Sequence, residues 1–269
     1  MFKRTLENSL GISQRLDRQR RHWNKVVKDK KAFIPWEHKG ISEEEAEKEN
    51  LAFGEFASGY MSEELKIYCQ KKDKINPPMI LSVGWGKGYD YGWLREAISS
   101  GFKTSIVDIS DVACSWAEAF AESQWKIESD QYDYSTNPPL EPEVIRAEIR
   151  SALKDPETFL GLELRTVAIW YMSRIIGCLP SEKSATKVLQ KMGESLREKK
   201  EDESLNRIVL ISALRDDNPD RVGKTSKLYS RNSILQHISE GSGSPSVHCR
   251  EKVYRYFGQI YTAMTITTK

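Results

Sequence analysis

The hydrophobic positions of the chain form short continuous runs, separated by stretches of helical periodicity. Continuous apolar runs are typical of strands that are covered on both faces, and the intervening pattern is typical of the covering helices. This alternation predicts an α/β fold. The expected strands are Met79–Val83, Thr104–Val107, Val144–Ile149, Thr166–Met172 and Arg207–Leu214, followed by two extended segments, Val247–Phe257 and Tyr261–Thr268.

The first part of the chain has a different pattern, which predicts helices. Apolar side chains recur there at helical spacing, and basic side chains fill the remaining positions. The apolar positions are Ile12, Leu16, Trp23 and Val27. We therefore predict a helical segment at residues 1–77 and a main domain at residues 78–269.

Two shorter helices are expected after this first helix, at 41–49 and 62–72. The first of them begins with a Ser-x-x-Glu capping box at Ser42. Between the two, Gly54 and Gly59 bracket an aromatic-rich stretch. We interpret this stretch as a loop that is able to close on a ligand.

A glycine-rich turn follows the first predicted strand. Gly84, Gly86 and Gly88 stand at every second position, so the backbone is able to turn sharply and approach a ligand closely. A nicotinamide or flavin fingerprint needs its third glycine where Tyr89 stands, which disfavours a dinucleotide. Asp108 ends the second strand, and a carboxylate there is able to accept both hydroxyls of a ribose. The stretch predicts a nucleotide-binding site.

The segment Ser82–Gly88, together with Asp108, resembles the first motif of the class I S-adenosylmethionine (SAM) methyltransferases. The order of the later strands and the closing extended pair resemble that family as well. The resemblance implies a doubly wound, seven-stranded, mostly parallel sheet with an antiparallel C-terminal hairpin, an N-terminal helical lid and SAM as the cofactor. The cofactor-binding residues that it implies are Ser82, Gly84, Trp85, Gly86, Gly88, Asp108, Ile109 and Ser173.

Two positions depart from the family pattern. Ser82 stands where the family usually has an acid that orients the methionine amino group. The family often places a second acid after its third strand to bind the adenine amino group. Glu148, Arg150 and Ser151 are the local candidates here, and none matches that pattern well.

Substrate contacts follow from the resemblance only by analogy with lid helices of this family. His22, Trp23 and Tyr60 are the candidates in the N-terminal segment, and Arg174 follows the fourth strand, where a guanidinium is able to clamp a carboxylate. Each has a plainer interpretation: Trp23 as a core residue, His22 as a surface residue and Arg174 as a member of a surface ion pair. No residue is marked as the catalytic base.

Three functions stay open at this point. The resemblance implies a methyltransferase that acts on a small-molecule acceptor. A second possibility is an enzyme of the same fold that uses SAM without methyl transfer, by cyclisation or elimination on the aminobutyryl chain with release of methylthioadenosine. Ser82 is compatible with such unusual handling of that chain. The third is a SAM-binding module without catalytic activity.

Charge and composition narrow the expected partners. The chain has 41 basic and 39 acidic residues, a formal net charge of +2, which argues against nucleic acid or an anionic membrane as a partner. We expect a cytoplasmic enzyme, because the sequence shows neither a membrane-spanning apolar run nor the layout of a secretion signal. The 4 cysteines lie far apart without a CxxC pair, which predicts reduced thiols and no metal site.

Overall fold

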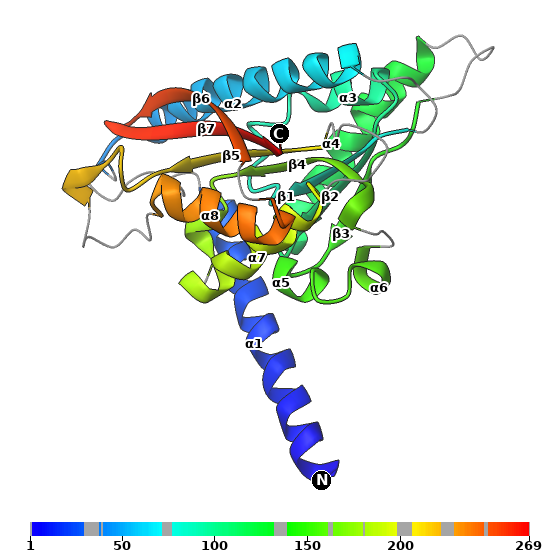
Figure 1. Cartoon of the computed structure of the whole chain (residues 1–269), viewed down its shortest axis with the longest axis vertical. Coiled ribbons are helices and arrows are strands. Elements are labelled where there is room, and N and C mark those ends of the chain that lie inside the picture. Colours follow the sequence, from blue (N-terminus) through cyan, green and yellow to red (C-terminus); the bar gives the residue numbers. More distant parts are fainter. Residues whose placement is uncertain are drawn as a thin grey trace.

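One continuous sheet of seven strands organises the computed structural model of the chain, in the order β3-β2-β1-β4-β5-β7-β6 (Figure 1). Its strands are β1 (Met79–Val83), β2 (Lys103–Asp108), β3 (Glu143–Arg146), β4 (Val167–Ser173), β5 (Arg207–Ala213), β6 (Val247–Tyr256) and β7 (Gln259–Thr268). The first five strands are parallel to one another, whereas β7 is antiparallel to both β5 and β6. The predicted fold class is confirmed.

The structure describes residues 2–29, 38, 40–71, 77–131, 139–160, 164–179, 181–197, 206–221, 229–244 and 247–268. The α-helices in these ranges are α1 (Phe2–Lys28), α2 (Glu43–Lys71), α3 (Leu94–Ser99), α4 (Asp111–Asp130), α5 (Ile149–Ala152), α6 (Pro156–Leu160), α7 (Glu182–Glu194) and α8 (Arg231–Ser242). Short 3₁₀ turns are η2 (Leu164–Thr166), η3 (Ile176–Cys178) and η4 (Pro219–Arg221).

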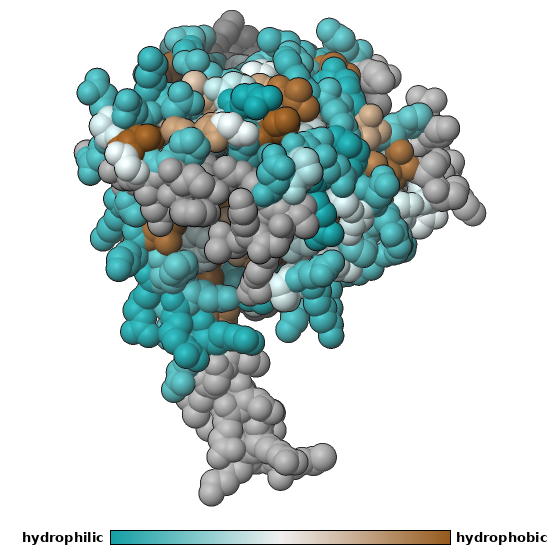
Figure 2. Space-filling model, turned by 90° about the vertical axis from the view of Figure 1, so that its left-hand side faces the viewer, coloured by the Kyte–Doolittle hydropathy of each residue, from teal (hydrophilic) through white to brown (hydrophobic). Residues whose placement is uncertain are grey.

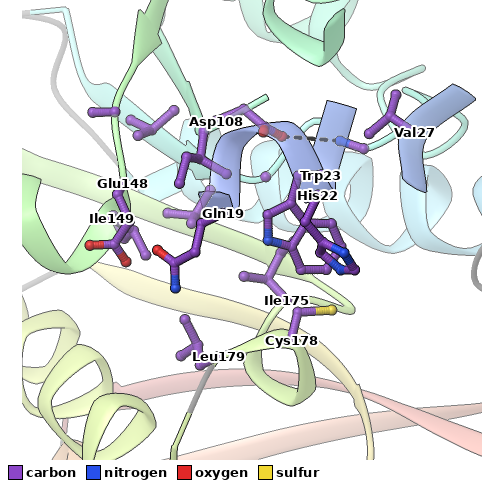
Figure 3. A pocket seen from close by; sticks show the side chains of 16 residues that line it. Gln19, His22, Trp23, Val27, Asp108, Glu148, Ile149, Ile175, Cys178 and Leu179 are labelled. Atoms are coloured by element: carbon purple, nitrogen blue, oxygen red, sulfur yellow. Dashed lines mark hydrogen bonds between the residues drawn. The ribbon is translucent and has the colours of Figure 1, made fainter. Parts of the chain in front are cut away.

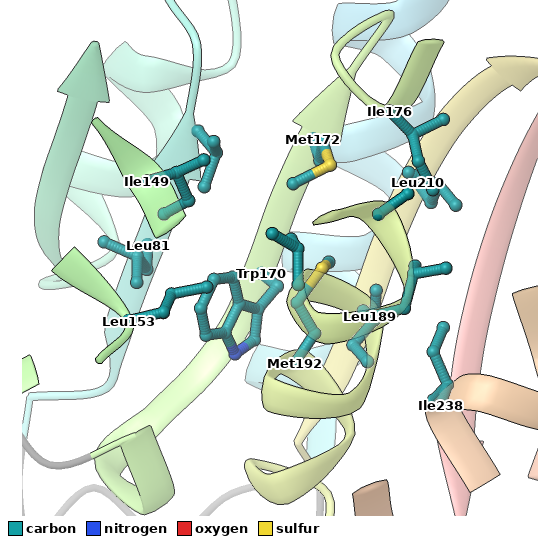
Figure 4. Packing of buried hydrophobic residues seen from close by; sticks show 14 of the residues in the cluster. Leu81, Ile149, Leu153, Trp170, Met172, Ile176, Leu189, Met192, Leu210 and Ile238 are labelled. Atoms are coloured by element: carbon teal, nitrogen blue, oxygen red, sulfur yellow. The ribbon is translucent and has the colours of Figure 1, made fainter. Parts of the chain in front are cut away.

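The central strands are buried on both faces, because successive side chains of a strand point to opposite sides of the sheet. Ile80 and Tyr171 pack in the layer formed with α2, α3 and α4. Their neighbours Leu81 and Trp170 pack in the opposite layer, formed with α5, α7 and α8. Figure 4 shows the Trp170 ring beside Leu153 in that second layer. The continuous apolar runs in the sequence therefore reflect a sheet with helices on both sides.

Helix α2 is one continuous helix, which corrects the expectation of two shorter helices with a loop between them. Its buried apolar side chains recur every three or four residues along one face: Phe53, Ala57, Tyr60, Met61, Leu65 and Tyr68. Gly54 lies inside this helix because α2 packs closely on the turn after β1. A Cβ at Gly54 would lie 2.2 Å from the backbone oxygen of Tyr89. The glycine indicates close packing here and does not mark a loop.

The start of α2 is as expected. The backbone N–H of Ser42 donates to the Glu45 carboxylate at 2.9 Å, and the N–H of Glu45 donates to the Ser42 hydroxyl at 3.1 Å. This reciprocal pair is the predicted capping box. The division of the chain between residues 77 and 78 stays a prediction.

The boundary of the third strand differs from the prediction. The third strand ends at Arg146 and does not continue to Ile149, because Glu148 caps the short helix α5 by accepting from the N–H of Ser151. Helix α3 starts at Leu94, after a series of turns. Strand β3 is short because it lies at the edge of the sheet, where it pairs with β2 alone, and because charged residues interrupt its apolar sequence.

Helix α1 leaves the body of the molecule and carries a hydrophilic surface where its side chains are described (Figures 1 and 2). Its exposed basic residues there are Arg15, Arg18, Arg20, Arg21, Lys25 and Lys28. None of the helices in the described ranges has the length and apolar character needed to cross a lipid bilayer.

Candidate functional site

A cavity of about 260 Å³ lies at the carboxyl ends of β1, β2, β3 and β4, underneath α1 (Figure 3). Strand order reverses at this place, because β1 pairs with β2 on one side and with β4 on the other. Open α/β sheets bind ligands at such a switch point. The cavity is lined by Gln19, His22, Trp23, Val27, Val83, Gly84, Gly86, Val107, Asp108, Ile109, Ala147, Glu148, Ile149, Ile175, Cys178 and Leu179.

The glycine-rich turn forms one wall of the cavity. Gly84 and Gly86 both line it, and both have a left-handed backbone, with φ of 83° and 57°. A Cβ at Gly84 would lie 2.2 Å from the side chain of Ile175, which lines the same cavity from the far end of β4. Glycine is therefore required at position 84 by both backbone conformation and space, and the backbone conformation favours it at position 86.

Asp108 ties the glycine turn to the second strand. Its carboxylate accepts the backbone N–H of Trp85 at 2.7 Å, of Gly86 at 3.3 Å and of Ser110 at 2.8 Å. Burial raises the pKa of Asp108, and the bonds from the backbone oppose that rise. The backbone N–H of Ile109 contributes as well, so backbone groups use most of the roughly four acceptor positions of this carboxylate.

Ser82 does not face the cavity. It is fully buried in β1, and its hydroxyl is hydrogen-bonded to the hydroxyl of Tyr91. The Tyr91 hydroxyl in turn donates to the backbone oxygen of Gly84 at 3.1 Å, and burial raises the pKa of Tyr91 well above its usual value. The position at which the family usually has an acid therefore belongs to a buried hydroxyl chain behind the glycine turn.

Other predicted cofactor residues also lie outside the cavity lining. The Trp85 ring packs against Tyr91, with 4.1 Å between ring centroids, and a Cβ at Gly88 would lie 2.4 Å from that indole. Ser173 is buried at the end of β4. Of the predicted set, the cavity lining contains Gly84, Gly86, Asp108 and Ile109.

Helix α1 covers the cavity and is held on two sides. On one side, the Asn24 side chain accepts from the Ser110 hydroxyl at 2.8 Å and donates to Asp111 at 3.2 Å. On the other side, the Gln19 side chain accepts from Arg150 at 3.3 Å. His22 and Trp23 lie between these two attachments and line the cavity (Figure 3).

The other two predicted substrate contacts lie elsewhere. Tyr60 is buried where α2 packs on the C-terminal hairpin, and its hydroxyl is 2.9 Å from that of Thr265. The guanidinium of Arg174 lies 4.2 Å from the centre of the Phe53 ring and donates to Asn50 at 3.3 Å. The structure thus brings His22 and Trp23 to the cavity, whereas Tyr60 packs from α2 against the hairpin and Arg174 lies against α2.

The sequence analysis did not assign several cavity residues to the site. Ile175, Cys178 and Leu179 follow β4, so the end of an apolar strand was the available signal. Gln19 lies on a polar stretch of a helix, and nothing in its neighbourhood marks it. Among the described residues, no group of three or more His, Cys, Asp or Glu side chains is arranged to hold a metal ion.

Similarity to solved structures supports the same fold. The plantazolicin methyltransferase BpumL, solved with a monoazolic desmethylPZN analogue and SAH, has a TM-score of 0.51 and 10% identity, over 94% of this chain and 99% of that one. The chain has the fold of the class I methyltransferases. The related BamL structure with a triazolic analogue and SAH gives a TM-score of 0.50 at 10% identity, over 94% of this chain and 100% of that one.

The CurJ carbon methyltransferase matches with a TM-score of 0.47 and 12% identity over 74% of this chain, and this chain spans about half of its length, 51%. No protein-family model and no curated protein sequence matches the chain.

Proposed function

We propose that the protein is a SAM-dependent methyltransferase that acts on a small-molecule acceptor. The observation that carries this proposal is the link between Asp108 and the backbone N–H groups of Trp85 and Gly86. It joins the glycine turn and the acid at the end of β2 into one cradle at the switch point of the sheet. Solved structures of the same fold contain SAH, the product of SAM.

The cavity residues fit the parts of SAM. Asp108 and Ile109 form the side suited to a ribose and a base, and Ile149 adds an apolar wall beside them. Trp23 lines the cavity, and the face of its indole favours a sulfonium cation. Among the cavity-lining residues there is no Lys or Arg to oppose that positive charge.

When bound, SAM supplies an electrophilic methyl group on its sulfonium. The protein's contribution is to hold the two reacting atoms in line and to keep water away from them. Helix α1 excludes water from above, and the glycine turn fixes the ligand from below. His22 and Trp23, whose rings are 5.3 Å apart, are the groups of α1 that we expect to contact the acceptor.

The size of the cavity supports a small acceptor. At about 260 Å³ it is near the lower end of ligand pockets, and α1 passes across it. A macromolecule would need a broader opening than the space beneath one helix. The near balance of charge, a net +2, also provides no general attraction for nucleic acid.

Methyl-labelled SAM tests the proposal when it is incubated with the purified protein and a protein-free extract of small molecules. We expect SAH to form and the label to enter an acceptor of low mass. Methylthioadenosine without a labelled acceptor, or SAM that binds but stays unchanged, would contradict methyl transfer.

The variant Gly86→Val tests the same proposal through a loss of SAM binding. Gly86 has φ of 57° in the cavity wall, so Gly86→Val places a branched side chain where the ligand lies. We expect at least a tenfold loss of SAM binding, about 1.4 kcal/mol or more. Gly258→Val is the control, because Gly258 has a similar φ of 70° in the hairpin with open space around it. Equal SAM binding by both variants would contradict the assignment of the cradle.

A further inference from the structure

Gln19 is a polar side chain of α1 that lines the cavity. It lies next to Glu148 and Ile149, on the side away from His22 and Trp23 (Figure 3). Asp108 and Ile109, at the end of the neighbouring strand β2, line the same cavity. A ligand held by Asp108 through its ribose would therefore place its base near Gln19.

The amide of Gln19 has a defined orientation. Arg150 donates to the Gln19 oxygen at 3.3 Å. A guanidinium has donors only, so the oxygen of the amide must be the atom that faces Arg150. The amide nitrogen consequently points into the cavity, toward Leu179 (Figure 3). Gln19 thus presents an N–H donor to whatever the cavity holds.

The neighbouring acid has a different role, because a carboxylate accepts hydrogen bonds and does not donate them. Glu148 accepts from the backbone N–H of Ser151 at 3.1 Å and from its hydroxyl at 3.2 Å, and it also contacts Arg150. These donors use most of the acceptor positions of that carboxylate. Glu148 therefore holds Arg150 in place, and Arg150 is a positioning residue for the Gln19 amide.

Resting on the proposed function, we infer that Gln19 reads the purine base of the bound nucleoside by donating a hydrogen bond to one of its ring nitrogens. The ring nitrogens N1, N3 and N7 of adenine are acceptors, whereas its exocyclic amine is a donor. A donor on α1 therefore selects a purine that has an unprotonated ring nitrogen at that place. Covering the cavity and recognising the base become a single event, because both depend on α1.

Replacing Gln19 by glutamate distinguishes recognition of the base from a purely structural role of this side chain. Gln19→Glu keeps the shape of the side chain and strengthens its link to Arg150, so α1 stays attached. It replaces the N–H donor with a carboxylate oxygen, which repels a ring nitrogen. We expect calorimetry to give roughly tenfold weaker SAH binding for Gln19→Glu. Gln14→Glu, an exposed glutamine of the same helix outside the cavity lining, is the matched control and should bind SAH like the wild type.

Deaza analogues of SAH identify which ring nitrogen of the adenine accepts the hydrogen bond from Gln19. Each replaces N1, N3 or N7 by a C–H group, and we expect one of them to bind the wild type about tenfold more weakly than SAH. In Gln19→Met that difference should disappear, because the donor is gone. Equal binding of SAH and all three analogues by the wild type, or unchanged SAH binding by Gln19→Glu, would overturn the inference while leaving the proposed function in place. A wild type that fails to bind SAH would overturn both.

Discussion

Helices α1 and α2 both precede the sheet, yet they are attached to it in different ways. Helix α2 buries a full apolar stripe and a charged side chain: Glu64, 1% exposed, pairs with Arg207 at 2.9 Å. The same carboxylate also accepts from Thr265 at 2.7 Å and contacts Arg250. Among the described side chains of α1, only Val27 is fully buried, and the helix is otherwise held by polar contacts.

Because of this difference, we interpret α2 as a fixed part of the domain and α1 as a cover over the cavity. Removing α2 would expose its apolar stripe and leave buried charges without partners, both of which are costly. Lifting α1 exposes little apolar surface and breaks a few hydrogen bonds that water replaces. The two helices are similar in length, 27 and 29 residues, and they differ in the type of attachment. We therefore expect α1 to be the helix that moves and a ligand to enter the cavity by displacing it.

The largest expected effect concerns the anchor of α2. Glu64→Ala removes the carboxylate that pairs with Arg207, a side chain that is 4% exposed. We expect the free energy of unfolding, measured by urea denaturation, to fall by about 3–5 kcal/mol. Glu63→Ala is the control: its pair with Lys252 at 3.2 Å is solvent-exposed, and the expected loss is below about 1 kcal/mol. Similar losses in both variants would show that the buried pair is not the anchor.

A smaller effect concerns the floor of the cavity beneath α1. Asp108→Ala removes the acceptor of the Trp85 and Gly86 amides and of the ligand's ribose. We expect SAM affinity, measured by calorimetry, to fall by roughly 1–3 kcal/mol. Asp130→Ala, at the far end of α4, should leave that affinity unchanged. Unchanged affinity in the Asp108 variant would contradict the ribose assignment.

The smallest effect concerns the attachment of α1 itself. Asn24→Ala removes the contacts to Ser110 and Asp111. We expect faster amide hydrogen exchange in α1, corresponding to about 0.5–1.5 kcal/mol of local stability, with no change in α2. Lys25→Ala, an exposed neighbour, should leave both helices as they are. If exchange in α2 rises together with that in α1, the two helices move as one unit and the comparison above is wrong.

The contrast between extensive burial and polar attachment also explains which features the sequence predicts. Buried strands such as β4 and β5 appear in the sequence as continuous apolar runs, because both of their faces are covered. The positions of Gly84, Gly86 and Asp108 in the cavity wall follow from that strand order together with the glycine spacing.

Contacts between distant parts of the chain explain the features that the sequence does not predict. Gly54 has the appearance of a loop glycine until the Tyr89 backbone is placed against it. Ser82, a predicted cofactor residue, bonds to Tyr91, nine residues later, and lies outside the cavity lining. Tyr60 meets Thr265 across most of the chain, 205 residues away. Contacts of this kind depend on packing, and no local pattern in the sequence encodes them.

The most direct measurement is a crystal structure of the protein with SAH. Our account predicts the nucleoside under α1, with a ribose hydroxyl on Asp108 and the amino-acid end along Gly84 and Gly86. It also predicts that the Ser82 hydroxyl stays bonded to Tyr91 and away from the ligand. SAH bound at another place, or a crystal grown at saturating SAH in which this cavity holds none, would contradict the assignment of the site.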